Sequence, residues 1–358
     1  MTNSTVLEDP AVRAKVDPGG MLESVAGLPE QCRQAWRAAQ TLTLPPDYAQ
    51  IDRILILGMG GSAIAGDMFR VRLQRESAVP VFNVRQYDLP PFVDGRTLII
   101  ASSFSGNTEE ALSAFDQALA TPAKKLAITA GGKLLATARA NGIPVFSYEF
   151  GGEPRAALGW GLMPLLAITQ KLGLMTGVDR DVDEAITVME SLRGEIGADA
   201  PASDNAAKRL AQRLHDRLPV IYGAGPLTEV AHRWKTQLNE SSKVWCFFEE
   251  LPELHHNATV GIELPARIAR ATTVVMLRSS SLLHPRVRLR YDWTRQLLEK
   301  AGVDSVTVDT QGKSALAQIM SSVLFGDYVS GYLALLYGVD PSPTAVIAEL
   351  RAWLAQQP

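Results

Sequence analysis

Short aliphatic runs alternate with helical patterns along the first half of the chain. The alternation predicts buried strands over residues 54–57, 79–84, 98–101, 125–129 and 144–147. Helices are predicted between strands, for example over residues 108–119. Strands and helices that alternate in this way are typical of a mainly parallel, doubly wound sheet.

The same alternation restarts at Leu218, after a helical stretch over residues 177–217 that has no convincing strand. Further strands are predicted over residues 219–222, 244–248, 272–277 and 305–308, and final helices over 314–337 and 344–355. Each half opens with an apolar strand that ends in a Gly-x-Gly turn, at Gly58–Gly60 and Gly223–Gly225. The repetition predicts a tandem pair of related α/β domains, each an αβα sandwich.

The predicted boundaries divide the chain into four parts. These are an N-terminal helical extension (1–50), a first α/β domain (51–175), a helical linker (176–205) and a second α/β domain with C-terminal helices (206–358). In the extension, residues 21–40 are predicted to form a helix and a half. Residues 155–173 are predicted as one long helix, whose apolar run is too short to span a bilayer.

Composition and charge exclude several partners. Apolar residues make up 46% and charged residues 20% of the 358 residues, which suits globular domains with sizeable cores. The formal net charge of −3 gives no electrostatic case for nucleic acid or an anionic membrane. Cys32 and Cys246 form no metal or redox motif, and the first 18 residues lack the apolar core of a signal peptide. We therefore expect a soluble, cytoplasmic protein.

The strand over residues 98–101 ends in a turn rich in hydroxyl groups, Ser102-Ser103-Phe104-Ser105-Gly106-Asn107-Thr108, directly before a helix. Such a turn presents free backbone N–H groups, hydroxyls and the positive end of a helix dipole to one point. A simple N-cap needs one hydroxyl, so this turn favours a phosphate site over a surface cap. The third strand of the second half ends in Arg278-Ser279-Ser280-Ser281, so one phosphate site per chain is predicted.

The motif Gly58-x-Gly60-x-x-Ala63 also matches a dinucleotide-binding turn. The acidic residue that such a site needs after the next strand is missing from residues 79–85. The loops after the first and third strands of a doubly wound sheet can meet at one crevice, which would place Gly61 and Ser62 beside the hydroxyl-rich turn. One sugar-phosphate pocket is therefore favoured over a nucleotide site.

Candidate acid–base groups lie in the second half. Glu240 stands where a predicted helix gives way to the strand over 244–248, a common place for active groups, although an exposed helix end is the more frequent case. Further along, His255 and His256 lie in a Pro-flanked loop without the spacing of a metal site. A carboxylate and a loop histidine are what proton transfer needs. Arg155, at a predicted helix start, fits a solvated residue and a pocket cation equally well.

Taken together, these motifs resemble the bifunctional phosphoglucose/phosphomannose isomerases, which carry two sugar isomerase (SIS) domains. The resemblance covers about residues 54–354. It rests on Gly58-Met59-Gly60-Gly61-Ser62, Ser103-Phe104-Ser105-Gly106-Asn107-Thr108, Pro154-Arg155-Ala156, Asn239-Glu240 with Lys243, Pro252-Glu253 with His256-Asn257, and Asp340-Pro341-x-Pro343. It implies a homodimeric aldose–ketose isomerase that interconverts fructose 6-phosphate with glucose 6-phosphate and, as a further expectation, mannose 6-phosphate, without metal or nucleotide.

The resemblance also implies a role for each site residue. Glu240 would be the base that moves a proton between C1 and C2, and Arg155 would stabilise the enediolate. His256, supplied by the partner subunit, would open the sugar ring. The phosphate-binding residues would be Gly61, Ser62, Ser103, Ser105 and Thr108.

Arg351 departs from the family pattern. It stands where the family carries a C-terminal lysine that assists ring opening, and arginine is a poor proton donor or acceptor. The alternative function is therefore a sugar-phosphate-binding protein without catalysis, either a sensor or a degenerate homologue. The presence of Glu240, Arg155 and His256 favours the enzyme, because a pure binding protein needs no base.

Overall fold

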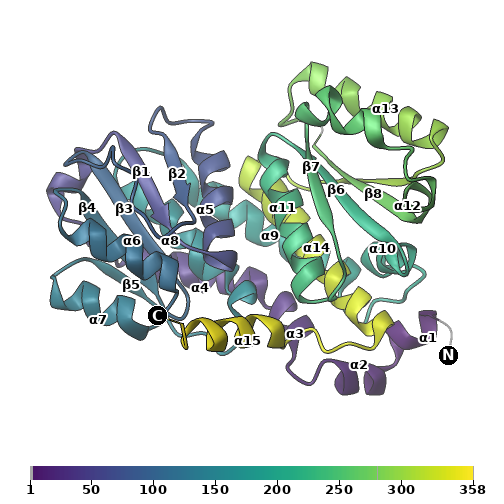
Figure 1. Cartoon of the computed structure of the whole chain (residues 1–358), viewed down its shortest axis with the longest axis horizontal. Helices are drawn as coiled ribbons and strands as arrows, with labels where there is room; N and C mark the ends of the chain where they lie inside the picture. Colours follow the sequence, from purple (N-terminus) through teal and green to yellow (C-terminus); the bar gives the residue numbers. More distant parts are fainter. Residues whose placement is uncertain (1–2, 280, 358) are drawn as a thin grey trace.

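The computed structural model of the chain describes residues 3–279 and 281–357 and contains two parallel sheets covered by helices (Figure 1). The first sheet consists of β1 (Arg53–Leu57), β2 (Val81–Val84), β3 (Thr97–Ser103), β4 (Lys124–Thr129) and β5 (Val145–Ser147), in the order β2-β1-β3-β4-β5. Its helices are α5 (Gly60–Leu73), α6 (Glu109–Leu119), α7 (Gly132–Ala140) and α8 (Leu158–Lys171). The predicted doubly wound fold is confirmed.

The second sheet repeats the strand order of the first. It consists of β6 (Leu218–Ala224), β7 (Phe247–Leu251), β8 (Thr272–Arg278) and β9 (Asp304–Asp309), in the order β7-β6-β8-β9. Its connections are α11 (Pro226–Glu240), α12 (Ala266–Ala271), α13 (Pro285–Lys300) and the short 3-10 turns η3 (Glu253–His256) and η4 (Ala258–Gly261). All pairs are parallel in both sheets.

The remaining helices are α1 (Asn3–Glu8), α2 (Pro10–Val16), α3 (Met21–Ala26), α4 (Leu28–Gln40), η1 (Pro46–Ala49), α9 (Val178–Ile196), α10 (Ala206–Leu214), α14 (Ala315–Tyr337) and α15 (Ala345–Leu354). Of these, α4, α9 and α14 form a central layer between the two sheets (Figure 1). The helix and a half predicted over residues 21–40 corresponds to α3 and α4. Helix α14 packs against α9, α10 and α11, and α4 packs against α8 and α9.

Alternating side chains of the strands divide the apolar core. Ile54 and Ile56 of β1 face the central helical layer, whereas Leu55 and Leu57 face α6 on the other side of the sheet. This period of two is that of a strand buried on both faces. The cluster on the central side is continuous through both sheets, from Ile54 to Tyr332 of α14. The two domains therefore share one core.

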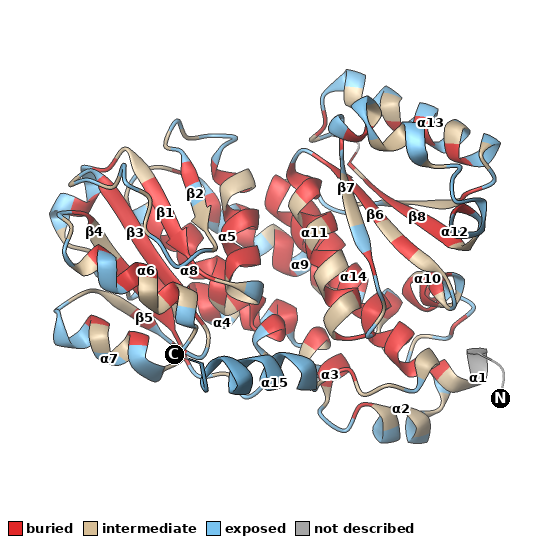
Figure 2. Cartoon of the chain, viewed as in Figure 1, coloured by how far each residue is buried: buried red, intermediate tan, exposed pale blue. Residues whose placement is uncertain are grey.

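Helix α14 is long and apolar enough to cross a membrane by length and composition, but 89% of its apolar window is buried inside the protein. Figure 2 shows this helix buried along most of its length. Its hydrophobicity is that of a core helix, because every side of it packs against protein.

Two predicted boundaries are wrong. The strand expected over residues 244–248 begins at Phe247, because the backbone of Val244 bonds to the end of α11: its N–H donates to Leu238, and its carbonyl accepts from the Asn239 side chain at 2.9 Å. These bonds take the place of a sheet ladder at Val244.

The helix expected to begin at Arg155 begins instead at Leu158, after a 3-10 turn, η2 (Pro154–Ala156). The Arg155 carbonyl accepts from the Arg233 side chain at 2.7 Å, and the Gly159 N–H donates to the Gln31 side chain at 2.6 Å. Two side chains from other helices thus replace the helical bond between residues 155 and 159.

Helices α11 and α14 approach closely at Gly326, and this contact makes a stability prediction. A Cβ at Gly326 would lie 2.3 Å from the Trp234 ring, whose Nε1 donates to the Ser322 carbonyl at 2.8 Å. We expect Gly326→Ala to lower the free energy of unfolding by about 1–3 kcal/mol, because the ring must move. Urea denaturation measures the change.

Gly194 of α9 provides the matched control. It is exposed, and a Cβ there would meet nothing within 4 Å. Gly194→Ala should therefore raise the free energy of unfolding by about 0.5–1 kcal/mol, since alanine favours the helix. Equal effects of the two substitutions would contradict the packing argument.

Candidate active site

The hydroxyl-rich turn after β3 forms a compact loop at the start of α6. The Ser103 hydroxyl lies 2.8 Å from the Thr108 hydroxyl and accepts from the Gly106 N–H at 3.1 Å. Thr108 occupies the N-cap position with extended backbone, and its side chain makes no cap bond. The hydroxyls and the first N–H groups of α6 are thus gathered at one point, while Ser105 lies exposed on the rim.

Glycines allow this loop to approach its neighbours. Gly106 has φ +65°, and a Cβ there would lie 1.8 Å from the Gly131 carbonyl oxygen. A Cβ on Gly58 would lie 2.8 Å from the Ser102 carbonyl oxygen, so the loops after β1 and β3 abut at the point where the strand order reverses. The structure therefore brings Gly61 and Ser62, at the start of α5, to the same edge of the sheet as the hydroxyl-rich turn.

Arg155 lies beside the loop after β1. A Cβ on Gly61 would lie 3.4 Å from the Arg155 Cα, so α5 begins against η2. The Arg155 side chain is only 3% exposed, which rules out the solvated alternative. Burial lowers the pKa of Arg155 despite the nearby carboxylates, of which Glu240 has the largest effect.

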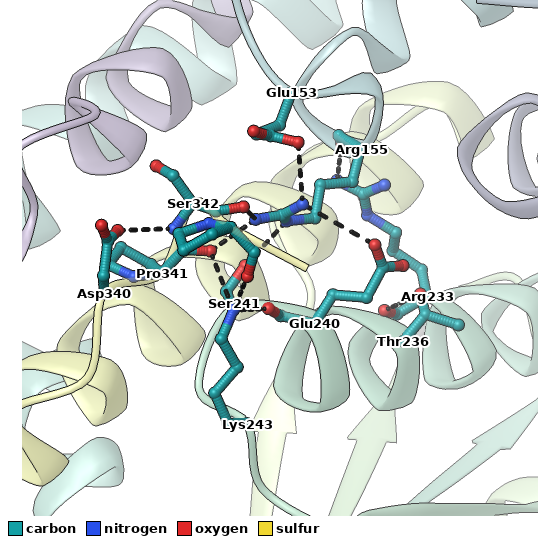
Figure 3. Close-up of polar contacts among 11 residues, drawn as sticks. Glu153, Arg155, Arg233, Thr236, Glu240, Ser241, Lys243, Asp340, Pro341 and Ser342 are labelled. Atoms are coloured by element: carbon teal, nitrogen blue, oxygen red, sulfur yellow. Dashed lines mark hydrogen bonds and ion pairs between the residues drawn. The ribbon is translucent and has the colours of Figure 1, made fainter. Parts of the chain in front are cut away.

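The Arg155 guanidinium is held on several sides (Figure 3). Its Nη2 donates to the Pro341 carbonyl and to the Ser342 carbonyl, the latter at 2.7 Å. Its Nε donates to the Ser241 hydroxyl at 3.2 Å. Its Nη1 lies 3.7 Å from the Glu240 carboxylate. The same Nη1 also donates to the Glu153 carboxylate at 3.4 Å. The cation is thus fixed in place, and a fixed cation can stabilise developing negative charge.

Glu240 is the last residue of α11, and its side chain is 29% exposed. The carboxylate is therefore accessible from solvent while it faces Arg155. The helix brings Glu240 from the second domain to Arg155 of the first, which lies beside the loop after β1. The sequence placed Glu240 at a helix end correctly, but could not show which groups of the first domain it meets.

Arg233 supports this arrangement and was missed by the sequence analysis. Its side chain is 1% exposed, and its Nη2 donates to Asp327 of α14 at 2.8 Å and to the Arg155 carbonyl at 2.7 Å. Its position between Val230 and Trp234, on the apolar face of α11, was the signal that could have identified it. A buried arginine on such a face needs partners from other elements.

His256 does not meet Glu240 within one chain. It is exposed in η3, directly after β7, at the sheet edge where α11 begins. Glu240 stands at the opposite end of α11, which has 15 residues. A helix of that length is about 22 Å long. His255, the residue before His256, bonds to Thr294 at 2.8 Å and to Arg290 at 2.9 Å. Burial, followed by the positive charge of Arg290, lowers the pKa of His255.

Arg351 lies on α15, which is exposed along its whole length (Figure 2). The helix follows the tail of residues 340–344 whose carbonyls bind Arg155. In the view of Figure 1 it extends from this tail towards the first domain. The tail that joins α15 to the rest of the protein is thus the segment that binds Arg155.

The corresponding turn after β8 is already occupied by a side chain. Gln318 of α14 accepts from the Ser279 hydroxyl at 2.5 Å and from Thr310 at 2.8 Å, and donates to Ser281 at 2.7 Å. These bonds use the polar groups that a phosphate would need. This agrees with the expectation of one phosphate site per chain, on the turn after β3, which stays a prediction.

Among the described residues, one group has ligand-type atoms close enough for a metal ion. Atoms of Asp67, Glu229 and His232 lie within 4.8 Å of one another. Arg85 pairs with Asp67, and Arg70 pairs with Glu229. Because an arginine balances each carboxylate, we assign no metal to this group. It is an ion-pair network that joins α5 and β2 to α11.

The environment of the two carboxyl groups in this network differs. Burial, and then the charge of Glu229, raise the pKa of Asp67. Burial would also raise the pKa of Glu229, but its bond with His232 and the charge of Arg70 outweigh it, so that pKa is lowered.

A family model described as the bacterial phospho-glucose isomerase C-terminal SIS domain matches residues 203–354. A bifunctional phosphoglucose/phosphomannose isomerase from Caldicellulosiruptor bescii is 42% identical over 94% of this chain and 99% of its own. A protein of the same name from Aquifex aeolicus is 36% identical over 85% and 91%. The structure of a hypothetical protein from Thermus thermophilus matches 97% of this chain and 93% of its own, with a TM-score of 0.73 at 16% identity.

The two parallel sheets and the matching family model define an α/β protein whose second half is a SIS domain. The two relatives, at 42% and 36% identity over 94% and 85% of the chain, define its family more narrowly. The chain belongs to the family of bifunctional phosphoglucose/phosphomannose isomerases. This confirms the resemblance drawn from its motifs.

The buried ion pair of Arg233 and Asp327 supports a prediction on stability. Arg233→Met would leave the Asp327 carboxylate, which is 5% exposed, without its cation. We expect the free energy of unfolding to fall by about 3–5 kcal/mol. Chemical denaturation followed by circular dichroism measures this loss.

Arg295→Met is the control, because Arg295 and its partner Glu299 are 53% and 74% exposed. It should change the free energy of unfolding by less than about 0.5 kcal/mol. A similarly small loss for Arg233→Met would show that Arg233 does not support the core.

Proposed function

We propose that this protein is an aldose–ketose isomerase that interconverts fructose 6-phosphate with glucose 6-phosphate, and with mannose 6-phosphate as the second epimer. The observation that carries the proposal is the pairing of the accessible Glu240 carboxylate with the buried Arg155 guanidinium at 3.7 Å. A binding protein that only holds a sugar phosphate has no use for a base beside a fixed cation. The names of the relatives agree with the enzyme.

The proposed reaction moves one proton between neighbouring carbons. Glu240 takes the proton from C2 of the open-chain aldose and returns it to C1, and a second proton passes from the C2 hydroxyl to the C1 oxygen, which gives the ketose. In between, negative charge develops on the enediolate oxygens, and Arg155 stabilises it. Because Arg155 is already held by Ser241 and the Ser342 carbonyl, it needs no rearrangement when the charge appears.

The phosphate is proposed to bind where the first domain gathers its donors. Ser103, Ser105 and Thr108 would supply hydroxyls, and Gly61 and Ser62 would line the other side of the crevice. The support is their common position at the edge where β1 and β3 end, together with the open first turn of α6. The site lies between the first domain (51–175) and the second (206–358), with α4 of residues 1–50 and α9 of residues 176–205 packed between them (Figure 1).

A homodimer is part of the proposal. His256 is separated from Glu240 on the same chain by about the length of α11. A second copy could bring its own His256 to this site, where it would assist ring opening. We propose a cytoplasmic location for the dimer, which agrees with the burial of α14.

Exchange with solvent deuterium tests the proposed base. Incubation with fructose 6-phosphate in deuterated water, without added metal, should give glucose 6-phosphate or mannose 6-phosphate labelled at C2. Glu240→Gln should lower turnover by about 10²–10⁴-fold, because the amide cannot accept the proton. Proton NMR follows both product and label.

Ligand binding provides the control for this variant. Thermal stabilisation by fructose 6-phosphate should survive in Glu240→Gln, since the phosphate contacts are unchanged. Normal turnover by the variant would remove Glu240 as the base. Binding without any turnover by the unmodified protein would favour the non-catalytic alternative.

The arginine of α15 allows a separate test of ring opening. We expect Arg351→Lys to raise kcat, because a lysine ammonium donates a proton more readily than a guanidinium. Initial rates with fructose 6-phosphate measure the effect, and Arg351→Met serves as the control without charge. A rate unchanged in both variants would exclude Arg351 from the reaction.

A further inference from the structure

Lys243 follows α11 in an unusual backbone conformation. Its φ is 58°, in the left-handed region that non-glycine residues seldom adopt. A glycine would adopt this conformation without steric cost. The presence of a lysine here therefore points to a use for its side chain.

The Lys243 ammonium binds backbone carbonyls from two separate segments (Figure 3). Its Nζ lies 2.5 Å from the carbonyl of Glu240 and 2.7 Å from that of Pro343. The carbonyl of Pro341 lies 3.5 Å away. Lys243 thus joins the end of α11, where the proposed base stands, to the tail of residues 340–344.

This set of bonds argues against proton transfer by Lys243. An ammonium has three N–H donors, and three carbonyl oxygens already surround this one. Partial desolvation, followed by the positive charge of Arg155, lowers the pKa of Lys243. The group is nevertheless occupied by main-chain acceptors, which suits a tether better than an acid.

The tail that Lys243 binds has few other attachments. Arg155 binds the carbonyls of Pro341 and Ser342, and a Cβ on Gly19 would lie 2.4 Å from the Ser342 hydroxyl, so the tail lies against Gly19. Every residue of α15 beyond the tail is exposed. The direction of α15 is therefore set largely by how the tail is held.

We propose that Lys243 is a positioning residue that ties the tail, and with it α15 and Arg351, to the catalytic end of α11. The tether is a structural inference, and its consequence for turnover rests on the isomerase function proposed above. Through the shared Pro341 carbonyl, Lys243 also supports the site of Arg155. Loss of the ammonium would release the tail without removing any group that touches the sugar.

Hydrogen–deuterium exchange of the Lys243→Met variant tests the tether directly. We expect amides of residues 340–354 to exchange about three- to tenfold faster than in the unmodified protein, the effect of losing a net hydrogen bond or two. The rest of the chain should exchange at its former rate. Lys171→Met is the control. The exposed Lys171 ammonium likewise donates to a backbone carbonyl, that of Gln40 at 2.8 Å, but it lies away from the site.

Kinetics of the same variants separate positioning from chemistry. Lys243→Met should lower kcat/KM about three- to tenfold with an unchanged pH profile. Lys243→Arg should recover part of this loss, because it keeps the charge and donors in a less suitable planar geometry. If the methionine variant does not fold, Lys243→Gln, which keeps an N–H donor without the charge, takes its place.

The outcomes are distinguishable. Unchanged exchange in the tail would overturn the tether, whatever the activity. A shifted pH profile, with activity abolished in both the Met and the Arg variants, would overturn it in favour of a proton-transfer role. Faster exchange in a protein that shows no isomerase activity would support the tether and refute the proposed function instead.

Discussion

The buried side chain of Arg233 joins three elements that meet at the site. It lies on α11, forms an ion pair with Asp327 of α14 and donates to the carbonyl of Arg155 in η2. The bond from Arg233 to the Arg155 carbonyl takes the place of the helical bond from Gly159, so that η2 stays separate from α8. The Arg155 side chain can therefore turn towards the end of α11 instead of lying on a regular helix. A buried charge requires several partners at once, and here that requirement fixes where the domains meet.

Two similar domains contribute unequally to one site. Both repeat the strand order of a doubly wound sheet, and both open with a glycine turn. In the turn after β3 the Ser103 and Thr108 hydroxyls bond to each other beside the open first turn of α6, whereas after β8 Gln318 bonds to the hydroxyls of Ser279 and Ser281. The second domain contributes the end of α11 instead, with Glu240. In the proposed site, the difference between the two domains thus comes from a few side chains.

The C-terminal tail completes the site from a distant part of the sequence. Its carbonyls bind Arg155 and Lys243, which come from η2 and from the end of α11. Main-chain acceptors are well suited to this use, because they neutralise no charge and leave Arg155 its interaction with Glu240. The same tail carries α15 and Arg351 on an otherwise exposed helix. The position of that helix is therefore tied to the cation and the carboxylate of the site.

The sequence by itself determined the parallel sheets, the tandem repeat, the hydroxyl-rich turn and the helix end at Glu240, because strand periodicity and turn chemistry are local properties. It also identified the family, through motifs such as Ser103–Thr108. Only the tertiary structure decided that Arg155 is buried, that Arg233 binds its carbonyl, that Lys243 binds the C-terminal tail, and that His256 lies about the length of α11 from Glu240 on the same chain. The first three depend on hydrogen bonds and ion pairs between residues some 80 to 190 positions apart, and the last on how η3 and α11 are placed in the fold, and no local pattern encodes either.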